Sequence, residues 1–229
     1  GNNELVIHRP KLTDLATAQS GYLVGYFQQF EDALVTEAGA SFTSRTYRNF
    51  IDPISWADYN IFHMLPKNVD ALRLSAYFQK DRGRRMEGGA LWDFDRSANS
   101  TDGRDNDTSD WRGTGDGTDY FGHAWWQYLF ADSEFCQLYV DRWAVLRRGA
   151  FANASINGII DGYTAEFKAT DTDKPASRDY AKWYGSPTAN NLPTEASNLK
   201  SWLTTRAAWI DSQFAVAPSL SPGSGVITS

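Results

Sequence analysis

The chain has 229 residues, a formal net charge of −6 and an isoelectric point near 5.1. It contains no basic run that could displace counterions from a phosphate backbone, which argues against a general nucleic-acid-binding protein. The single cysteine, Cys136, excludes an internal disulfide framework and a thiolate zinc cluster. No apolar run is long enough to span a bilayer. The hydrophobic content of 41% fits a globular protein with a sizeable core.

Two helices are predicted in the first part of the chain. Residues 17–37 place apolar side chains at helical spacing and predict an amphipathic helix that Gly39 ends. A shorter helix is expected over 55–65, because Ser55 followed by Asp58 has the form of a capping box and Pro66 stops a helix. A loop then leads to Asp70.

A β-hairpin is predicted next. Apolar and polar residues alternate over 72–79, which is typical of a half-buried strand. Residues 80–84 predict a turn, and 86–92 predict the returning strand. In that strand Gly88 and Gly89 indicate a bulge or a close approach to another segment.

The hairpin predicts an acidic site at its open end. A turn centred near Arg82 places Asp70 nearly opposite Phe94, and therefore close to Asp93 and Asp95. Carboxylates that close together repel one another unless a cation or a shared proton lies between them. The alternative is that Asp70 caps a turn and Asp95 is merely solvated.

Residues 93–119 form a polar, irregular tract with eight aspartates and three arginines. A long loop inside a compact domain is usually functional or mobile. A calcium loop over Asp102–Asp110 is conceivable, although the spacing departs from the EF-hand pattern and lacks its closing Glu.

The rest of the chain predicts helices over 123–130, 133–148, 152–168, around Tyr180 and over 195–214. Arg142 falls on the apolar side of its helix, where a structural ion pair is expected and a contact with the acidic site is the alternative. The predicted architecture is a single α+β, mainly α domain over 1–215 with a loose tail over 216–229.

Isolated residue types give weaker signals. His8, His63 and His123 have no partner at metal-ligand spacing, so packing or capping roles are expected. There is no nucleophile elbow, Walker loop or dinucleotide fingerprint.

Aromatic residues make up 14% of the chain and are expected mainly in the core. A carbohydrate-binding module would need exposed tryptophans, with Trp111, Trp125 and Trp126 as the candidates.

Three stretches resemble a known family. KNVDALRLSAYFQKDR followed by GGALWDFD, and then WWQYLFADSEFCQLYVDRWAVLRRG, resemble the CotH kinase family, related to spore coat protein H, whose members have an atypical protein-kinase-like fold. The similarity is spread over most of residues 8–170. It implies transfer of phosphate from ATP, with magnesium, to Ser or Thr of a protein substrate. It also implies an extracytoplasmic or cell-surface location.

The resemblance assigns roles to the residues at the hairpin, because kinases place a catalytic Asp before a hairpin and a metal-binding Asp after it. Asp70 would orient and deprotonate the acceptor hydroxyl. Asp93 would bind the metal and nucleotide, with Asp95 as a second metal ligand. Ser75 stands where the family often has an Asn that holds a second metal, and Arg73 would supply positive charge that a kinase Lys usually provides.

The resemblance covers a kinase C-terminal lobe. No Gly-rich strand pair, and no strand Lys paired with a helix Glu, precedes residue 55. The N-terminal lobe of the same protein is therefore an expected partner, and the chain alone is expected to transfer phosphate poorly or not at all. A non-catalytic surface, adhesion or binding module on the same scaffold is the alternative, motivated by Ser75.

Overall fold

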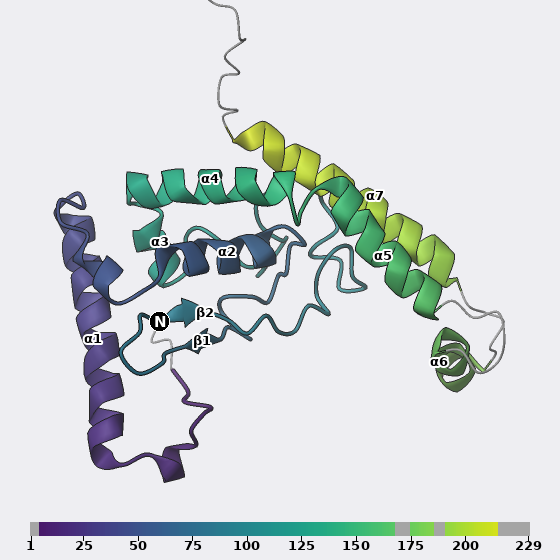
Figure 1. The fold of residues 1–229 in the computed structure, drawn as a ribbon. Coiled ribbons are helices and arrows are strands. Elements are labelled where there is room, and N and C mark those ends of the chain that lie inside the picture. The colour runs from purple at the N-terminus through teal and green to yellow at the C-terminus, as the bar shows by residue number, and fades with distance from the viewer. Residues whose placement is uncertain (1–4, 168–174, 186–190, 215–229) are drawn as a thin grey trace, which may run out of the picture.

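The computed structural model describes residues 5–167, 175–185 and 191–214, and these residues form a mainly helical structure with one small sheet (Figure 1). The expected mainly helical class with a small hairpin is confirmed. The predicted tail over 216–229 lies outside the described residues. The helices are α1 (Thr17–Gly39), α2 (Pro53–Met64), α3 (Trp125–Leu129), α4 (Ser133–Arg148), α5 (Asn153–Phe167), α6 (Pro175–Tyr184) and α7 (Leu192–Gln213), with short 3₁₀ helices over Leu12–Asp14 and Thr46–Asn49.

Helix α2 begins earlier than the predicted capping box implied. Its N-cap is Asp52, whose carboxylate accepts hydrogen bonds from the backbone N–H groups of Ile54 and Ser55. Pro53 occupies the first turn, where its fixed φ suits a helix and its missing N–H costs nothing. The Ser55 hydroxyl instead accepts from the backbone N–H of Gly88 at 3.0 Å, which joins α2 to the sheet.

The hairpin is much shorter than predicted. Its strands are β1 (Phe78–Gln79) and β2 (Glu87–Gly88), and they pair antiparallel with Phe78 opposite Gly88. Residues 70–75, expected to lie in or beside the first strand, form turns and bends. The predicted close approach at Gly88 is confirmed, because a Cβ placed there would lie 2.5 Å from Cβ of Tyr59.

An aromatic core lies between the helices and the hairpin. Helix α2 packs against α4 on one side and against β2 on the other, and α1 packs against α3 (Figure 1). Trp56 of α2 is fully buried and contacts rings from three other segments, namely Phe30, Phe78, Trp125 and Trp126. At the other end of α2, Met64 and Leu65 are also buried, and this end leads into the loop carrying Asp70.

The three tryptophans considered for carbohydrate binding all pack inward. Trp126 is 2% exposed, and Trp111 and Trp125 are partly buried against the core. The carbohydrate-binding interpretation therefore loses its candidate residues. Trp92 and Trp183, at 60% and 68% exposed, are the accessible tryptophans that the sequence pattern did not single out.

Helix α7 lies beside α5 at one end of the molecule and fastens the acidic tract to the core (Figure 1). The buried guanidinium of Arg206 donates to the backbone carbonyl oxygens of Thr108, Asp110 and Met64. Trp202 donates from Nε1 to the carbonyl of Asn106 at 3.1 Å. The tract predicted to be irregular is thus held by several tertiary bonds.

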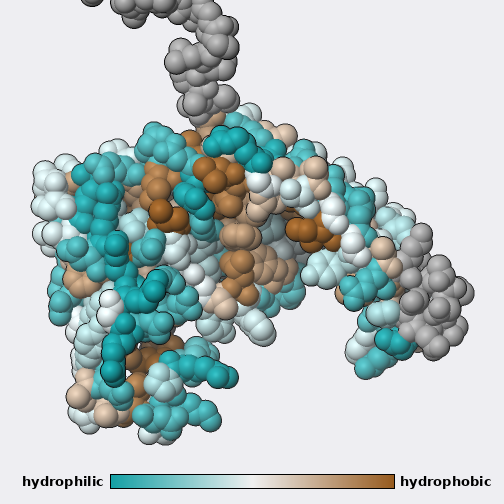
Figure 2. Space-filling view, in the orientation of Figure 1, coloured by the Kyte–Doolittle hydropathy of each residue, from teal (hydrophilic) through white to brown (hydrophobic). Residues whose placement is uncertain are grey.

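The exterior is mostly hydrophilic in the view of Figure 2, with hydrophobic residues gathered near the middle of that face. Within the described ranges, no helix has the combination of length and hydrophobicity that a membrane crossing requires.

Candidate active site around Asp70 and Asp93

The buried amide of Asn68 joins the two segments that carry Asp70 and Asp93. Its Oδ1 accepts from the backbone N–H of Asp70 at 3.3 Å, and its Nδ2 donates to the backbone carbonyl of Asp93 at 2.9 Å. The sequence predicted that these aspartates lie close together because strands pair. The structure brings their segments together through this side chain and the surrounding loops instead.

Ser75 and Asp93 form a direct contact. The hydroxyl of Ser75 donates to Oδ2 of Asp93 at 2.9 Å. Both residues adopt left-handed backbone conformations, with φ of 46° and 63°. Such conformations cost L-amino acids about 1 kcal/mol or more and concentrate at functional sites. The structure thus places Ser75 and Asp93, both candidate cofactor-binding residues, in direct contact.

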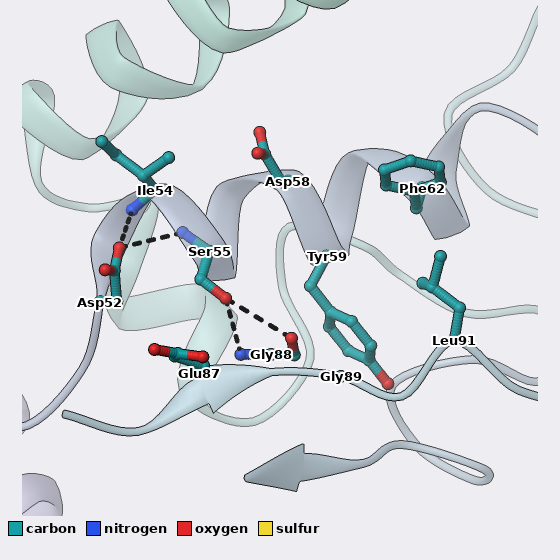
Figure 3. Close-up of a pocket in the computed structure, with 10 residues that line it drawn as sticks. All are labelled: Asp52, Ile54, Ser55, Asp58, Tyr59, Phe62, Glu87, Gly88, Gly89 and Leu91. Atoms are coloured by element: carbon teal, nitrogen blue, oxygen red, sulfur yellow. Dashed lines mark hydrogen bonds between the residues drawn. The ribbon is translucent and has the colours of Figure 1, made fainter. Parts of the chain in front are cut away.

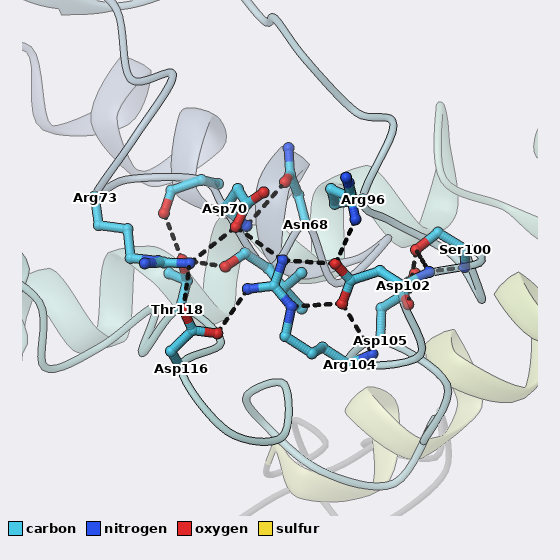
Figure 4. A network of polar contacts seen from close by, with 12 residues as sticks. Asn68, Asp70, Arg73, Arg96, Ser100, Asp102, Arg104, Asp105, Asp116 and Thr118 are labelled. Atoms are coloured by element: carbon cyan, nitrogen blue, oxygen red, sulfur yellow. Dashed lines mark hydrogen bonds and ion pairs between the residues drawn. The ribbon is translucent and has the colours of Figure 1, made fainter.

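Two arginines hold the side chain of Asp70 (Figure 4). Arg73 Nη2 lies 2.8 Å from Oδ1 of Asp70, and Arg104 Nη2 lies 3.1 Å from the same oxygen. Arg104 also pairs with Asp102 and with Asp116. Because Asp102 accepts hydrogen bonds from the Arg104 side chain, its pKa lies well below the ordinary value for an aspartate, and the Arg104 pKa is raised in turn.

Most of the other carboxylates in the acidic tract over 93–119 bond to arginines or to the backbone. Asp95 pairs with Arg96 at 3.3 Å, and Arg96 pairs with Asp102 at 2.6 Å. The buried Asp105 accepts from the backbone N–H and hydroxyl of Ser100. In the part of the chain that the structure describes, no cluster of three or more His, Cys, Asp or Glu side chains could hold a metal. The calcium loop considered over Asp102–Asp110 is not supported.

The comparisons with known proteins identify the family. A family model described as CotH kinase protein matches residues 3–210. The chain belongs to the CotH kinase protein family. No match to this CotH chain is found among the curated proteins or the solved structures.

Two exposed carboxylates of this CotH chain, Asp93 and Asp95, are compatible with magnesium bound together with a nucleotide. Magnesium is usually held by one or two protein carboxylates, with water and substrate phosphates completing its coordination. The Asp93 side chain is exposed, and among the described residues only Ser75 donates to its carboxylate. Asp95 is exposed as well but is engaged by Arg96. Asp93 therefore has an oxygen available for a metal, and Asp95 would have to leave its arginine.

A buried histidine supports the Asp93 segment. The His63 ring stacks on Phe94 with centroids 4.9 Å apart and planes 7° from parallel. Its Nδ1 faces the Asn68 amide nitrogen at 3.4 Å, while Nε2 has no partner among the described residues. Burial lowers the pKa of His63 to about 4. The expectation of a packing role for His63 agrees with this position.

Arg142 was expected to form a structural ion pair, and two further cations, Lys67 and Arg206, are buried against the acidic tract. Arg142 forms a bidentate ion pair with Asp58 on α2, so the structural interpretation is confirmed. Lys67 is fully buried and donates from Nζ to the carbonyl of Asp107 at 2.6 Å, and burial lowers its pKa. Burial also lowers the Arg206 pKa, to about 10.

A separate open hollow of about 490 Å³ lies between α2 and β2 (Figure 3). Asp52, Asp58 and Glu87 line it together with apolar side chains, and neither Asp70 nor Asp93 does. Asp58 is neutralised by Arg142, and Asp52 caps the helix. The hollow is thus distinct from the Asp70 and Asp93 site.

Sequence reasoning missed Asn68, Arg104 and the support from His63. Asn68 and His63 lie in or next to a loop that the pattern placed but did not interpret. The sequence could have identified Arg104 as an ion-pairing residue, because an arginine inside a tract of eight aspartates is expected to pair with several of them. Which aspartates it would pair with depends on the fold.

Proposed function

We propose that this CotH chain carries the phosphoryl-transfer residues of an ATP- and magnesium-dependent protein kinase whose acceptor is Ser or Thr of another protein. The observation that carries the proposal is the Asn68 amide, which holds the backbone of Asp70 and of Asp93 on its two sides. A catalytic base and a metal ligand must be held near one phosphate, because phosphoryl transfer depends on positioning and electrostatics.

In the proposed reaction the acceptor hydroxyl oxygen forms a bond to the γ-phosphorus of ATP. The bond from that phosphorus to the β–γ bridging oxygen breaks, ADP leaves, and the hydroxyl proton passes to the carboxylate of Asp70. Asp93, with Ser75 hydrogen-bonded to it, would hold magnesium, which neutralises charge on the phosphates when bound. Asp95 is the candidate second ligand once released from Arg96.

The two arginines beside Asp70 determine which of its carboxylate oxygens can accept a proton. Arg73 and Arg104 both donate to Oδ1 of Asp70, which leaves Oδ2 as the oxygen able to accept the acceptor proton. Arg73 was assigned a catalytic role from the resemblance, and its position beside Asp70 supports that assignment. Two guanidinium groups also place positive charge near the transferred phosphate.

The test is transfer of labelled γ-phosphate by the full-length protein to casein and to itself, because the chain alone is expected to transfer phosphate poorly or not at all. Asp70→Asn should lower the rate by at least about 100-fold, since general-base assistance typically contributes 10²–10⁴-fold. The control is Asp141→Asn, which changes an exposed carboxylate on α4 that bonds to Gln137. Transfer by Asp70→Asn at the rate of the unchanged chain would contradict the proposal.

A non-catalytic binding module is a second candidate, and one observation favours it. Arg73 and Arg104 both pair with Oδ1 of Asp70, so one oxygen of the carboxylate is already occupied by structural ion pairs. ATP binding that requires magnesium, with no transfer to any acceptor, would favour this module. Transfer that is lost in Asp70→Asn while ATP binding is retained would favour the kinase.

We also propose an extracytoplasmic or cell-surface location, with a surface or secreted protein as the acceptor. The family membership motivates both. Fractionation of cells that express the full-length protein tests the location, and the acceptor can be sought among the surface proteins that lose phosphate in an Asp70→Asn strain.

A further inference from the structure

The side chain of Asn68 is fully buried, and each of its polar atoms faces a partner of fixed character. The backbone N–H of Asp70 can only donate, so the atom that it meets must be the amide oxygen. The backbone carbonyl of Asp93 can only accept, so the atom that it meets must be the amide nitrogen. These two partners fix the orientation of the amide.

The second hydrogen of the same nitrogen points to His63. The Asn68 nitrogen lies 3.4 Å from Nδ1 of His63, which must therefore accept. The same histidine ring stacks on Phe94, the residue after Asp93. The segment that carries Asp93 is thus attached to α2 and its following loop at two points, the amide bond and the ring stack.

The backbone of Asn68 is itself anchored to the core. Its N–H donates to the carbonyl of His63 at 3.0 Å, and its carbonyl accepts from the hydroxyl of the buried Tyr120 at 2.8 Å. An anchored backbone and a bidentate side chain leave little freedom in the relative placement of the two segments that the amide joins. Residues 68 and 93 are 25 positions apart in the chain.

We propose that Asn68 is a positioning residue that sets the placement of Asp70 relative to Asp93. Its catalytic consequence rests on the proposed function. Only an amide supplies both the acceptor that the first segment needs and the donor that the second needs. A carboxylate of the same shape would keep the bond to Asp70 and would set an oxygen against the carbonyl of Asp93.

The chain offers a matched control in Asn60, a second fully buried asparagine. Its Nδ2 donates to the carbonyl of Tyr120 at 2.8 Å, and its Oδ1 accepts from the hydroxyl of Tyr139 at 2.8 Å. Asn60→Asp and Asn68→Asp each bury one carboxylate, keep the bond to the amide oxygen and lose the amide nitrogen as a donor. That nitrogen has one partner in Asn60 and two in Asn68. The two residues also differ in that only Asn68 touches the segments of the candidate site.

The first measurement is amide hydrogen exchange of the whole chain, read in peptides covering residues 69–75 and 92–97. Asn68→Asp should raise exchange at least fivefold in both peptides, relative to Asn60→Asp at a matched interval below each melting temperature. Unchanged protection of residues 92–97, or equal loosening of both peptides by Asn60→Asp, would overturn the proposal. Asn68→Ser, which removes both bonds without adding charge, replaces Asn68→Asp if the latter does not fold.

The second measurement is phosphoryl transfer by the same variants. A misplacement of about 1 Å costs on the order of 100-fold in rate, so Asn68→Ser should lower kcat by about that factor while the KM for the acceptor changes little. Asn60→Asp should change kcat by less than about threefold at a temperature where it is folded. Equal losses of kcat in the two variants count against the proposal. The transfer measurement uses the full-length protein with these substitutions. If the unchanged full-length protein transfers no phosphate, the proposed function fails, while the exchange measurement still decides the placement by Asn68.

Discussion

Arg104 donates to Oδ1 of Asp70 at 3.1 Å across 34 positions of sequence, so the acidic tract forms part of the candidate active site. The same guanidinium pairs with Asp102 and with Asp116. A tract that looks like a solvated loop in the sequence therefore borders the site, and Arg104 offsets the charge of Asp70, Asp102 and Asp116.

The ion pair between Arg104 and Asp102 predicts that the pKa of Asp102 changes when the arginine is replaced. Its pKa is lowered first of all by the Arg104 side chain. Arg104→Gln should therefore raise the Asp102 pKa toward the ordinary aspartate value of about 3.9. Carbon-13 NMR of the side-chain carboxyls measures the shift. Arg112→Gln removes an exposed arginine that pairs with Asp119 and should leave Asp102 unchanged; an equal response to both variants would contradict the assignment.

The buried His63 predicts a pH dependence of stability. Its pKa is about 4 in the folded chain and about 6.5 when unfolded, so the unfolded state binds the extra proton first as the pH falls. The free energy of unfolding should therefore decrease from pH 6.5 to pH 4, by up to about 3 kcal/mol from this group. Urea unfolding across that range measures it.

The control for His63 is His63→Leu, which removes the titrating group. Its free energy of unfolding should vary less steeply between pH 6.5 and pH 4 than that of the unchanged chain, whatever its absolute stability. Parallel pH profiles for the two proteins would show that folding does not lower the pKa of His63.

Arg206 predicts a large loss of stability when its hydrogen bonds are removed. Arg206→Met keeps much of the side-chain volume but leaves the carbonyls of Thr108 and Asp110 without this donor, whereas the carbonyl of Met64 still accepts from the backbone N–H of Lys67. Unsatisfied buried groups cost about 1–3 kcal/mol each where water cannot reach them, so a total loss of about 2–4 kcal/mol is expected. Arg148→Met, at an exposed site on α4, should change stability by less than about 0.5 kcal/mol. Denaturant titration of both variants compares them.

The close approach at Gly88 predicts a cost of adding one methyl group. A Cβ there would lie 2.5 Å from Cβ of Tyr59 and 3.3 Å from the carbonyl oxygen of Ser55. Gly88→Ala should therefore destabilise the chain by about 1–3 kcal/mol. Gly21→Ala, on an open face of α1, should be neutral or stabilising by up to about 1 kcal/mol. A melting temperature that is unchanged in Gly88→Ala would argue that the hairpin does not rest on α2.

The helices of this chain could be predicted from sequence because their signals are local. Helix α4 spans the predicted residues 133–148, and Asp132 caps it by accepting from the N–H of Glu134. The start of α2 was misplaced by two residues because Asp52-Pro53 is a stronger start signal than the capping-box pattern at Ser55.

The strands were less predictable for a physical reason. Residues 72–76 alternate between apolar and polar types, but Leu72 and Ser75 take positive φ values that no strand allows. Their conformations are set by tertiary bonds, such as Ser75 to Asp93, and an alternating pattern carries no information about such bonds. The sequence therefore predicted that Asp70 and Asp93 lie near each other, while its reason for that, a long hairpin, was wrong.

The residues that complete the site could not be predicted because their partners are distant in sequence. The hydrogen bonds from Asn68 to Asp93, from Arg104 to Asp70 and from Arg206 to Met64 form only after the chain has folded. Local patterns identify carboxylates as candidates. They do not show which amide or guanidinium will hold them.

We propose that Asp93 binds the magnesium of a nucleotide at this site, and calorimetric titration with ATP measures that binding. The full-length protein should bind ATP when magnesium is present, Asp93→Asn should weaken that binding at least about tenfold, and Asp141→Asn should bind as the unchanged protein does. Equal affinity of the unchanged protein and Asp93→Asn for ATP with magnesium would contradict the account.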